Sequence, residues 1–353
     1  MQILCIDVGA GTQDILLFDS EKNIENCVQL ILPSWTALVA KQLRNSLSRG
    51  EDVLIIGTIM GGFHFHGLRD FTKSKGRVFA TSEAAKTFHN NLERVKKMGV
   101  MVVGPKESSL LIRSGIKVIR ARDIDLNLIL NSLRGFSVEV ALGGVAVTVQ
   151  DHGEAPEGMS NRRFRFENIR KLLNADPGVF SLCFKKEEIP GYLTRMLAVR
   201  NSLKTQENLL LMDSGFAAIL GSLEDPEVNR KKRRLVVNIG NGHTLGAYLK
   251  GNDILALFEH HTSKLNPKKL KGLLKKLATG TLSNEEIYQD GGHGAWVSEE
   301  KKNFGEKEIE LISVTGPNRQ LLDPAHYHYA ATHGNMMLTG CFGLLMGYLR
   351  KFT

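Results

Sequence analysis

The chain has 353 residues, of which 42% are hydrophobic and 24% are charged. This length exceeds that of a usual single core and indicates two domains. The longest nearly apolar run, residues 336–349, is too short to cross a bilayer, and no signal-peptide pattern opens the chain. We therefore expect a cytoplasmic protein with no membrane partner.

The formal net charge of +9 favours anionic partners in general. The excess is concentrated at residues 230–234 and among the lysines of residues 264–276. Neither region interleaves aromatic side chains with the charge, so a nucleic-acid partner is disfavoured. The cysteines are too far apart in sequence to predict a metal-binding motif or a disulfide scaffold; they are Cys5, Cys27, Cys183 and Cys341.

Residues 1–19 predict a strand, a glycine loop and a second strand. An apolar run at 3–8 contains one carboxylate, Asp7, and the small residues 9–12 separate it from a second apolar run at 15–18. Two such runs joined by a short glycine turn are typical of a hairpin. The free backbone N–H groups of such a loop can bind a phosphate, and Asp7 at its mouth can hold Mg²⁺. The alternative is an ordinary buried hairpin.

Strand and helix signals then alternate, which predicts an α/β fold with a largely parallel sheet. Ser34, Ser82 and Asp123 are the expected helix caps. We expect strands at residues 26–32, 52–59, 77–80, 100–103, 117–120 and 138–149, and helices at 34–48, 82–97 and 123–133.

The second half repeats the opening design. After helices at 162–173 and 187–203, the polar residues 204–208 mark a boundary between domains 1–205 and 206–353. Residues 209–225 predict a strand, a break at Asp213 and a helix of small residues. Residues 235–251 predict a second strand, glycine loop and strand, with Asn238 in the place that Asp7 has in the first. A helix at 267–277, a strand at 308–314 and a helix at 335–350 complete the chain.

This order of motifs is similar to that of the superfamily of actin, sugar kinases and heat-shock chaperone ATPases. The first and second phosphate loops of that superfamily are resembled by IDVGAGTQDILLFD and VVNIGNGHTLGAYL, and its adenosine loop by ISVTGPNRQLL. Residues 213–221 and GNMMLTGCFGLL resemble its two connecting helices. The resemblance implies two ribonuclease-H-like domains with a nucleotide cleft between them.

Other phrases resemble one prokaryotic family labelled putative pyruvate formate-lyase activating enzyme; they include VFATSEAAKTFHNNLERVKKMGV, QDHG, SNRRFRF and DGGHGAW. The label implies radical S-adenosylmethionine chemistry. That chemistry needs three closely spaced cysteines for an iron–sulfur cluster. No three cysteines of this sequence are closely spaced, so we do not expect that activity.

The superfamily resemblance implies that ATP and Mg²⁺ are the cofactors. Asp7 and Asn238 would face the metal or its waters. The residues expected to contact the nucleotide are Gly9, Gly11 and Thr12 in one loop, Gly240, Gly242 and Thr244 in the other, and Gly316 near adenosine.

Three carboxylates are candidate catalytic groups: Asp7, Asp14 and Asp213. Asn238 stands where many members of the superfamily have aspartate, and an amide is no general base. Asp213 is therefore the candidate to position water, although it can equally be a helix N-cap. Asp14 can face the cleft or can be a polar residue at a sheet edge.

Histidines and arginines gather in the polar and glycine-rich breaks, which is where sites tend to lie. Glu259 with the 260–261 histidine pair, and Asp290 with His293, contain metal-ligand types. Adjacent strand residues face opposite ways, so His260 and His261 cannot both enter one site. Substrate or phosphate contacts are the alternative role, which also applies to His152, His243 and His333. Arg162, Arg163 and Arg165 can bind an anion or form a solvated helix start.

Three functions remain open. The first is Mg²⁺-dependent ATP binding with slow hydrolysis that couples domain closure to a protein partner. The second is a small-molecule kinase or another ATP-dependent enzyme, whose anionic second substrate would use the loops after Gly61 and Asp151. The third is a non-catalytic nucleotide sensor.

Overall fold

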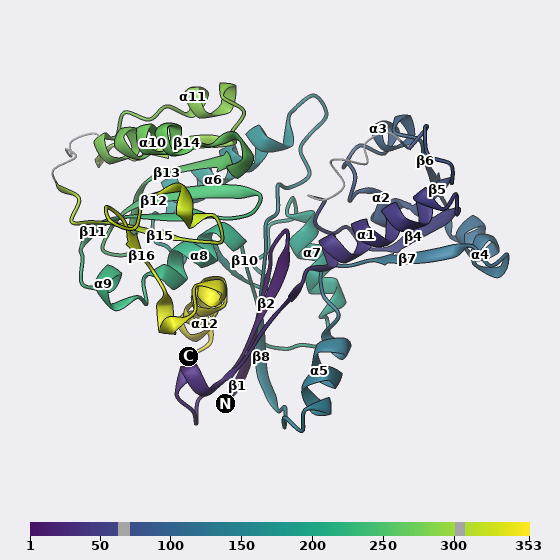
Figure 1. Ribbon diagram of the computed structural model, residues 1–353, viewed down its shortest axis with the longest axis horizontal. Helices are drawn as coiled ribbons and strands as arrows, with labels where there is room; N and C mark the ends of the chain where they lie inside the picture. The colour runs from purple at the N-terminus through teal and green to yellow at the C-terminus, as the bar shows by residue number, and fades with distance from the viewer. Residues whose placement is uncertain (63–70, 301–307) are drawn as a thin grey trace.

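The computed structural model describes residues 1–62, 71–300 and 308–353 (Figure 1).

The first sheet has six strands and contains the opening hairpin. The strand order is β3 (Val28–Pro33), β2 (Thr12–Asp19), β1 (Gln2–Val8), β8 (Leu142–Val149), β10 (Leu209–Met212) and β9 (Cys183–Lys185). The β1–β2 and β2–β3 pairs are antiparallel, whereas β8 runs parallel to both β1 and β10.

The second sheet repeats this connectivity. Its order is β14 (Gly294–Val297), β13 (Asp253–His261), β12 (His243–Lys250), β11 (Arg233–Ile239), β15 (Leu311–Thr315) and β16 (His328–Tyr329). Strands β13, β12 and β11 form an antiparallel meander that β14 extends at one side, and β15 and β16 follow β11 in parallel. A three-stranded meander extended by parallel strands is the ribonuclease-H-like topology, so the prediction of an α/β protein with two such sheets is confirmed.

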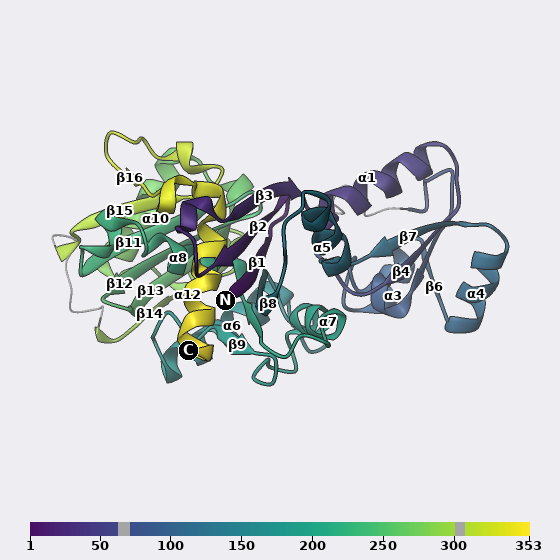
Figure 2. The ribbon, with the colours of Figure 1, turned by 90° about the horizontal axis from the view of Figure 1, so that it is seen from below.

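A third sheet lies between β3 and β8 in the chain and was not predicted as a separate unit. It is parallel, in the order β6 (Val100–Val103), β5 (Val78–Thr81), β4 (Val53–Gly57) and β7 (Lys117–Ala121). With α1 (Trp35–Ser48), α2 (Ser82–Ala85), α3 (Leu92–Lys97) and α4 (Pro105–Arg113) it forms the inserted unit, which projects to the right in Figures 1 and 2. The unit has its own hydrophobic core, which includes Val39, Leu43, Val53, Val78 and Ile119.

Two helices of small and apolar residues join the two large sheets. Helices α8 (Ser214–Ser222) and α12 (Thr339–Phe352) pack on each other, and both contribute to one core that also receives Ile3 from β1 and Val236 from β11. Glycines permit this close packing. A β-carbon on Gly343 would lie 1.9 Å from the Ala217 carbonyl oxygen, and one on Gly221 would lie 1.8 Å from that of Thr339.

Helices α5 (Leu126–Gly135) and α7 (Thr194–Ser202) pack on one face of the first sheet, and α10 (Pro267–Thr279) and α11 (Asn284–Gln289) pack on one face of the second. Helices α6 (Asn161–Ala175) and α9 (Pro226–Asn229) contribute instead to the core that contains α8 and α12. The basic helix α10 is amphipathic, as its sequence predicts: Leu270, Leu273, Leu274 and Leu277 are buried against the second sheet. Among the described residues, no helix combines the length and hydropathy that a bilayer crossing requires.

Several helix predictions need correction. The helix expected over 82–97 is two short helices, α2 and α3, and Asn91 caps the second by accepting from Arg94 N. The helix expected from Asp123 is capped instead by Asp125, because Asp123 binds Arg195 and the Gly61 amide. The helix expected over 187–203 begins only at Thr194, and α4 was not predicted.

The domain boundary at 205/206 stays a prediction. Strand β10 follows this boundary in the chain, yet it pairs with β8 in the first sheet. A boundary after β10 would keep the first sheet whole.

Candidate functional site

A cleft of about 1040 Å³ lies between the two large sheets. Gly9, Ala10 and Thr12 of the first hairpin line one side, while the second hairpin contributes 240–243 and the loop after β15 contributes Gly316. The hairpins approach closely: a β-carbon on Gly11 would lie 3.1 Å from Asn241 Nδ2. The two predicted phosphate loops therefore face the same space.

Asp7 and Asp14 lie opposite each other on β1 and β2, and both line the cleft. Asp7 Oδ1 accepts hydrogen bonds from Thr148 Oγ1 at 3.1 Å and from Ser214 Oγ at 3.0 Å. Burial nevertheless raises the pKa of Asp7 to about 6. The cleft orientation of Asp14, one of the two alternatives, is the one observed.

Asp14 is 6% exposed, and its Oδ1 atom has no hydrogen-bond partner among the described residues. Burial and the neighbouring charge of Asp7 raise the pKa of Asp14 to about 8. Two carboxylates that disfavour each other's ionisation, one with an unused oxygen, fit a divalent cation that prefers oxygen ligands.

The residues of the second loop are divided between the cleft and the core. Asn238, Gly240 and Gly242 line the cleft. Thr244 does not: it is fully buried, and its hydroxyl lies 3.0 Å from that of Thr262. Gly316 has a φ of +94°, which only glycine adopts readily, and a β-carbon there would lie 2.6 Å from Asn238 Oδ1.

Asp213 is a helix cap inside a buried ion-pair network. Its Oδ1 accepts from Gly215 N at 3.1 Å, as an N-cap does. Arg165 NH1 and NH2 also bind its two oxygens, at 2.7 and 3.1 Å. Asp213 is outside the lining of the cleft. These contacts favour the capping role over the positioning of water.

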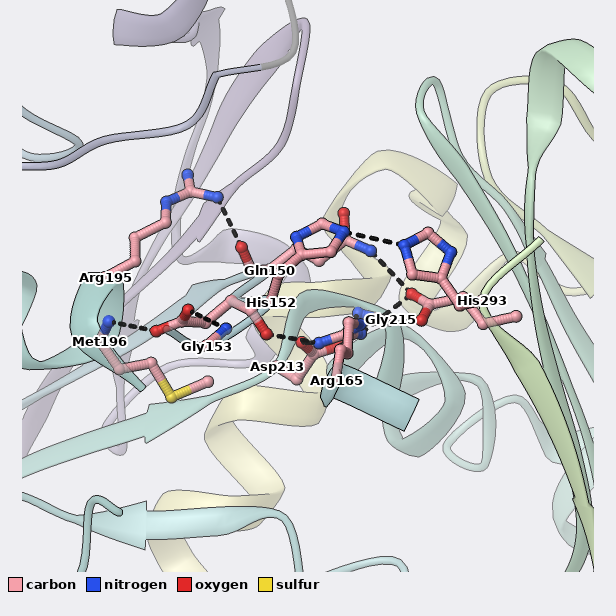
Figure 3. Close-up of polar contacts among 11 residues, drawn as sticks. Gln150, His152, Gly153, Arg165, Arg195, Met196, Asp213, Gly215 and His293 are labelled. Atoms are coloured by element: carbon pink, nitrogen blue, oxygen red, sulfur yellow. Dashed lines mark hydrogen bonds and ion pairs between the residues drawn. The ribbon is translucent and has the colours of Figure 1, made fainter. Parts of the chain in front are cut away.

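Arg165 links this cap to Glu259. Arg165 Nε donates to Glu259 Oε2 at 2.8 Å, and Arg165 NH1 also donates to the Asp151 carbonyl (Figure 3). Although burial opposes ionisation, the charge of Arg165 holds the pKa of Glu259 well below its usual range. Neither alternative weighed for Arg165, an anion site or a solvated helix start, is correct. The signal was available: Arg165 shares a helix face with Ile169 and Leu173, and all three are buried.

The other two arginines of this helix differ. Arg162 lines the cleft, donates to the Gly292 carbonyl and stacks its guanidinium 4.7 Å from the centre of the Tyr288 ring. Arg163 is exposed and lies 3.4 Å from Glu285. Only Arg162 therefore keeps the position expected of an anion-binding side chain.

Three histidines meet beside the cleft, and two of them, His152 and His243, line it. Ligand atoms of His152, His243 and His293 all lie within 4.8 Å of one another, and His152 Nε2 lies 2.8 Å from His293 Nε2 (Figure 3). The His261 ring is 4.7 Å from that of His243, its direct neighbour across the sheet. Burial holds the pKa values of His152 and His293 well below their usual range.

The grouping of the remaining histidines differs in part from expectation. His260 does face away from His261, and its Nε2 lies 3.0 Å from Asp290 Oδ2. The sequence grouped Asp290 with His293, but in the structure the histidine partner of Asp290 is His260. His333 is elsewhere, with its ring against Phe342. Each histidine was identifiable from sequence, but their grouping depends on the packing of segments up to 141 residues apart.

A family model described as "Putative pyruvate format-lyase activating enzyme" matches residues 60–321. The chain belongs to this family. No curated protein matches the sequence significantly. Among solved structures, the chain is similar to the Lmo2764 protein of Listeria monocytogenes, titled a putative N-acetylmannosamine kinase. That similarity covers 100% of both chains at 10% identity, with a TM-score of 0.37.

The cysteines do not form a binding site for the iron–sulfur cluster of radical S-adenosylmethionine chemistry. All four are buried, and burial raises the pKa of the Cys183 thiol to about 12. Within the described ranges no three cysteines lie close enough to share a metal ion. The one group there of three or more potential metal ligands is the histidine cluster. The cysteines thus suit packing rather than iron–sulfur ligation.

Proposed function

We propose that this protein binds ATP with Mg²⁺ in the cleft between its two ribonuclease-H-like sheets. The observation that carries the proposal is the pair of glycine hairpins that face each other across the cleft, with Asp7 and Asp14 beside the first. Small loops with free backbone N–H groups suit phosphates, and oxygen ligands suit Mg²⁺.

Each residue has a part in this proposal. Asp7, with or without Asn238, would hold Mg²⁺ or its waters. Gly9, Gly11, Thr12, Gly240 and Gly242 would contact phosphates, and Gly316 would lie near adenosine. Mg²⁺ supplies charge neutralisation of the phosphates when it is bound.

We expect ATP turnover to be slow, with closure of the cleft acting on a partner protein. Asn238 cannot serve as a base, and both oxygens of Asp213 are bound by Arg165. Asp14, with one oxygen that accepts no hydrogen bond from a described residue, is the remaining candidate to orient a water molecule.

One observation favours a second candidate, a kinase that acts on an anionic small molecule. The cleft continues toward the inserted unit, where Lys86, His89 and Arg94 line it. Its volume is at the upper end of ordinary ligand pockets, so a second substrate can fit beside a nucleotide. Part of the loop after Gly61, residues 63–70, falls outside the described residues.

Calorimetry with ATP and ADP, with and without Mg²⁺, tests the proposal. We expect binding that Mg²⁺ strengthens and that Asp7→Asn weakens at least tenfold. Asp253→Asn is the matched control, because Asp253 is an exposed carboxylate at the start of β13, outside the cleft lining. No nucleotide binding in any condition would rule out the kinase and the ATPase together. A screen for metabolites that stimulate turnover separates a kinase from a slow ATPase, and binding without turnover indicates a sensor.

A further inference from the structure

The histidine cluster is assembled from three separate segments of the chain. His152 follows β8 of the first sheet, His243 begins β12 of the second, and His293 lies directly before β14. Nothing in the nucleotide proposal uses these side chains together. His293 is 1% exposed, and its Nδ1 atom has no hydrogen-bond partner in the part of the chain that is described.

The backbone on each side of the cluster is held in place. Asp151 accepts from Gly153 N at 2.8 Å and from Met196 N at 2.9 Å, which fixes the loop that carries His152 (Figure 3). The amide of His293 donates to the Glu259 carbonyl at 2.9 Å, and Thr262 N donates to the Gly242 carbonyl at 3.0 Å. The rings are thus presented from anchored segments, as a preorganised site requires.

A fixed negative charge lies beside the rings. The Glu259 carboxylate is bound by Arg165 and by Gln150 Nε2, the latter at 2.7 Å. It interacts electrostatically with both His243 and His293. Because its oxygens are already engaged, Glu259 supports the cluster from outside and is not itself counted as a ligand. A carboxylate charge beside the rings favours a bound cation among them.

The donor atoms select the kind of ion. Imidazole nitrogens suit Zn²⁺, Cu²⁺, Fe²⁺ and Ni²⁺, whereas Mg²⁺ and Ca²⁺ prefer oxygen. Zn–N bonds of about 2.0–2.1 Å in tetrahedral geometry separate the nitrogens by about 3.3 Å. The observed separations, from 2.8 Å for one pair to no more than 4.8 Å for any, bracket this value.

We propose that His152, His243 and His293 bind one divalent transition-metal ion of the Zn²⁺ type. Three protein nitrogens leave a coordination position open, and His152 and His243 both line the cleft. The open position therefore faces the cleft, where it suits an oxygen of an anionic ligand. Since His152 comes from the first sheet and the others from the second half, the ion also ties the two halves together. The proposal does not rest on nucleotide binding.

The test uses full-length protein without a polyhistidine tag, stripped of metal by a chelator and free of nucleotide. Titration with Zn²⁺ in a calorimeter should show one site per chain, and Co²⁺ should give the visible absorption of a low-coordinate nitrogen site. His152→Ala, His243→Ala and His293→Ala should each weaken Zn²⁺ binding by more than about 100-fold, since even supporting partners alter affinity 10- to 100-fold. His326→Ala is the control, because this histidine is 73% exposed and outside the cluster.

Circular dichroism identifies any variant that fails to fold. If the buried His293 variant does so, the two partly exposed positions, His152 and His243, decide the question. Wild-type protein that takes up no stoichiometric Zn²⁺ overturns the proposal, and so does affinity that survives in the folded variants. Either result leaves the nucleotide proposal intact, because no nucleotide is present in the titration.

Discussion

At the scale of single residues, the buried side chain of Arg165 has the largest structural role, although it does not line the cleft. Arg165 is 5% exposed and bridges Asp213, at the start of α8, to Glu259, on β13. It therefore connects the strand–helix junction of the first sheet to the second sheet. A buried pair of this kind is costly to break, because removal of one partner leaves the others charged and desolvated.

Arg165→Met should destabilise the protein by about 3–5 kcal/mol at pH 7. The sign of the pH dependence follows from Glu259, whose pKa is held well below its usual range. In the wild type this depressed pKa contributes stability that is present at neutral pH and lost as the pH falls through it. The variant lacks that contribution, so the difference in unfolding free energy should persist from pH 7 to pH 5 and shrink as the pH falls below about 4.5, the ordinary pKa of a glutamate.

Thermal and urea unfolding measure this difference. Arg163→Met is the matched control, because Arg163 lies two residues away on the same helix and is 44% exposed. We expect it to change stability by no more than about 0.5 kcal/mol. Equal effects of the two substitutions would mean that the buried network does not hold the halves together.

The sequence indicated which residues belong to the cleft better than it indicated which side chains form ion pairs with each other. Asp7, Asp14 and residues of both glycine loops line the cleft, and their hairpins were recognisable because a hairpin is a local pattern. Asp213 and Arg165 lie outside the cleft lining, because Arg165 pairs with Asp213 and also with Glu259, which lies 94 residues beyond Arg165. A partner at that distance leaves no periodic trace in the sequence.

At the scale of elements, local patterns explain the successes, whereas the failures have two different causes. Both hairpins and helix α1, with its Ser34 cap, follow from local patterns and are confirmed. Residues 82–97 were expected to be one helix, yet Asn91 caps a second helix inside this segment. The separate parallel sheet at 53–121 was missed for another reason: its strands were recognised, but sheet membership depends on pairing and not on strand pattern.

The contact between α8 and α12 makes a prediction about glycine. A methyl group on Gly343 would lie 1.9 Å from the Ala217 carbonyl oxygen, and helix backbones cannot yield as a flexible side chain does. Gly343→Ala should therefore destabilise the protein by about 1–3 kcal/mol, the usual cost of overpacking a core. Differential scanning calorimetry measures the change.

Gly272→Ala is the control for this substitution. Gly272 is also inside a helix, α10, but a β-carbon there meets nothing within 4 Å. Alanine at such a position should be neutral or stabilising by up to about 1 kcal/mol, because it favours the helix. A Gly343 variant as stable as the Gly272 variant would show that the helix contact is looser than the structure indicates.

At the scale of the whole molecule, the hydrophobic cores divide the chain differently from the two halves seen in sequence. One core runs through α8 and α12 and receives side chains from both large sheets. The inserted unit has a core of its own, formed by α1 and its parallel sheet. Elements that share a core unfold together, whereas a separate core can open by itself.

The protein's two tryptophans report on these two units. Trp35 lies at the start of α1, against the core of the inserted unit, and the Arg122 guanidinium is 4.4 Å from the centre of its ring. Trp296 lies on β14, is 7% exposed and belongs to the core shared by the large sheets. Trp296→Phe leaves only the first reporter, and Trp35→Phe leaves only the second.

In urea, the fluorescence of Trp35 should change at a lower concentration than that of Trp296. The reason is that the inserted unit buries a smaller core, while the two large sheets are held by α8, α12 and the Arg165 network. Far-UV circular dichroism of the wild type should show both steps, which controls for destabilisation by either substitution. Coincident midpoints for the two reporters, with a single transition in circular dichroism, would contradict this prediction. The inserted unit and the two sheets would then form one cooperative structure. In that case the ion pair between Asp123 and Arg195 would bind the inserted unit to the rest of the protein as firmly as a shared core would.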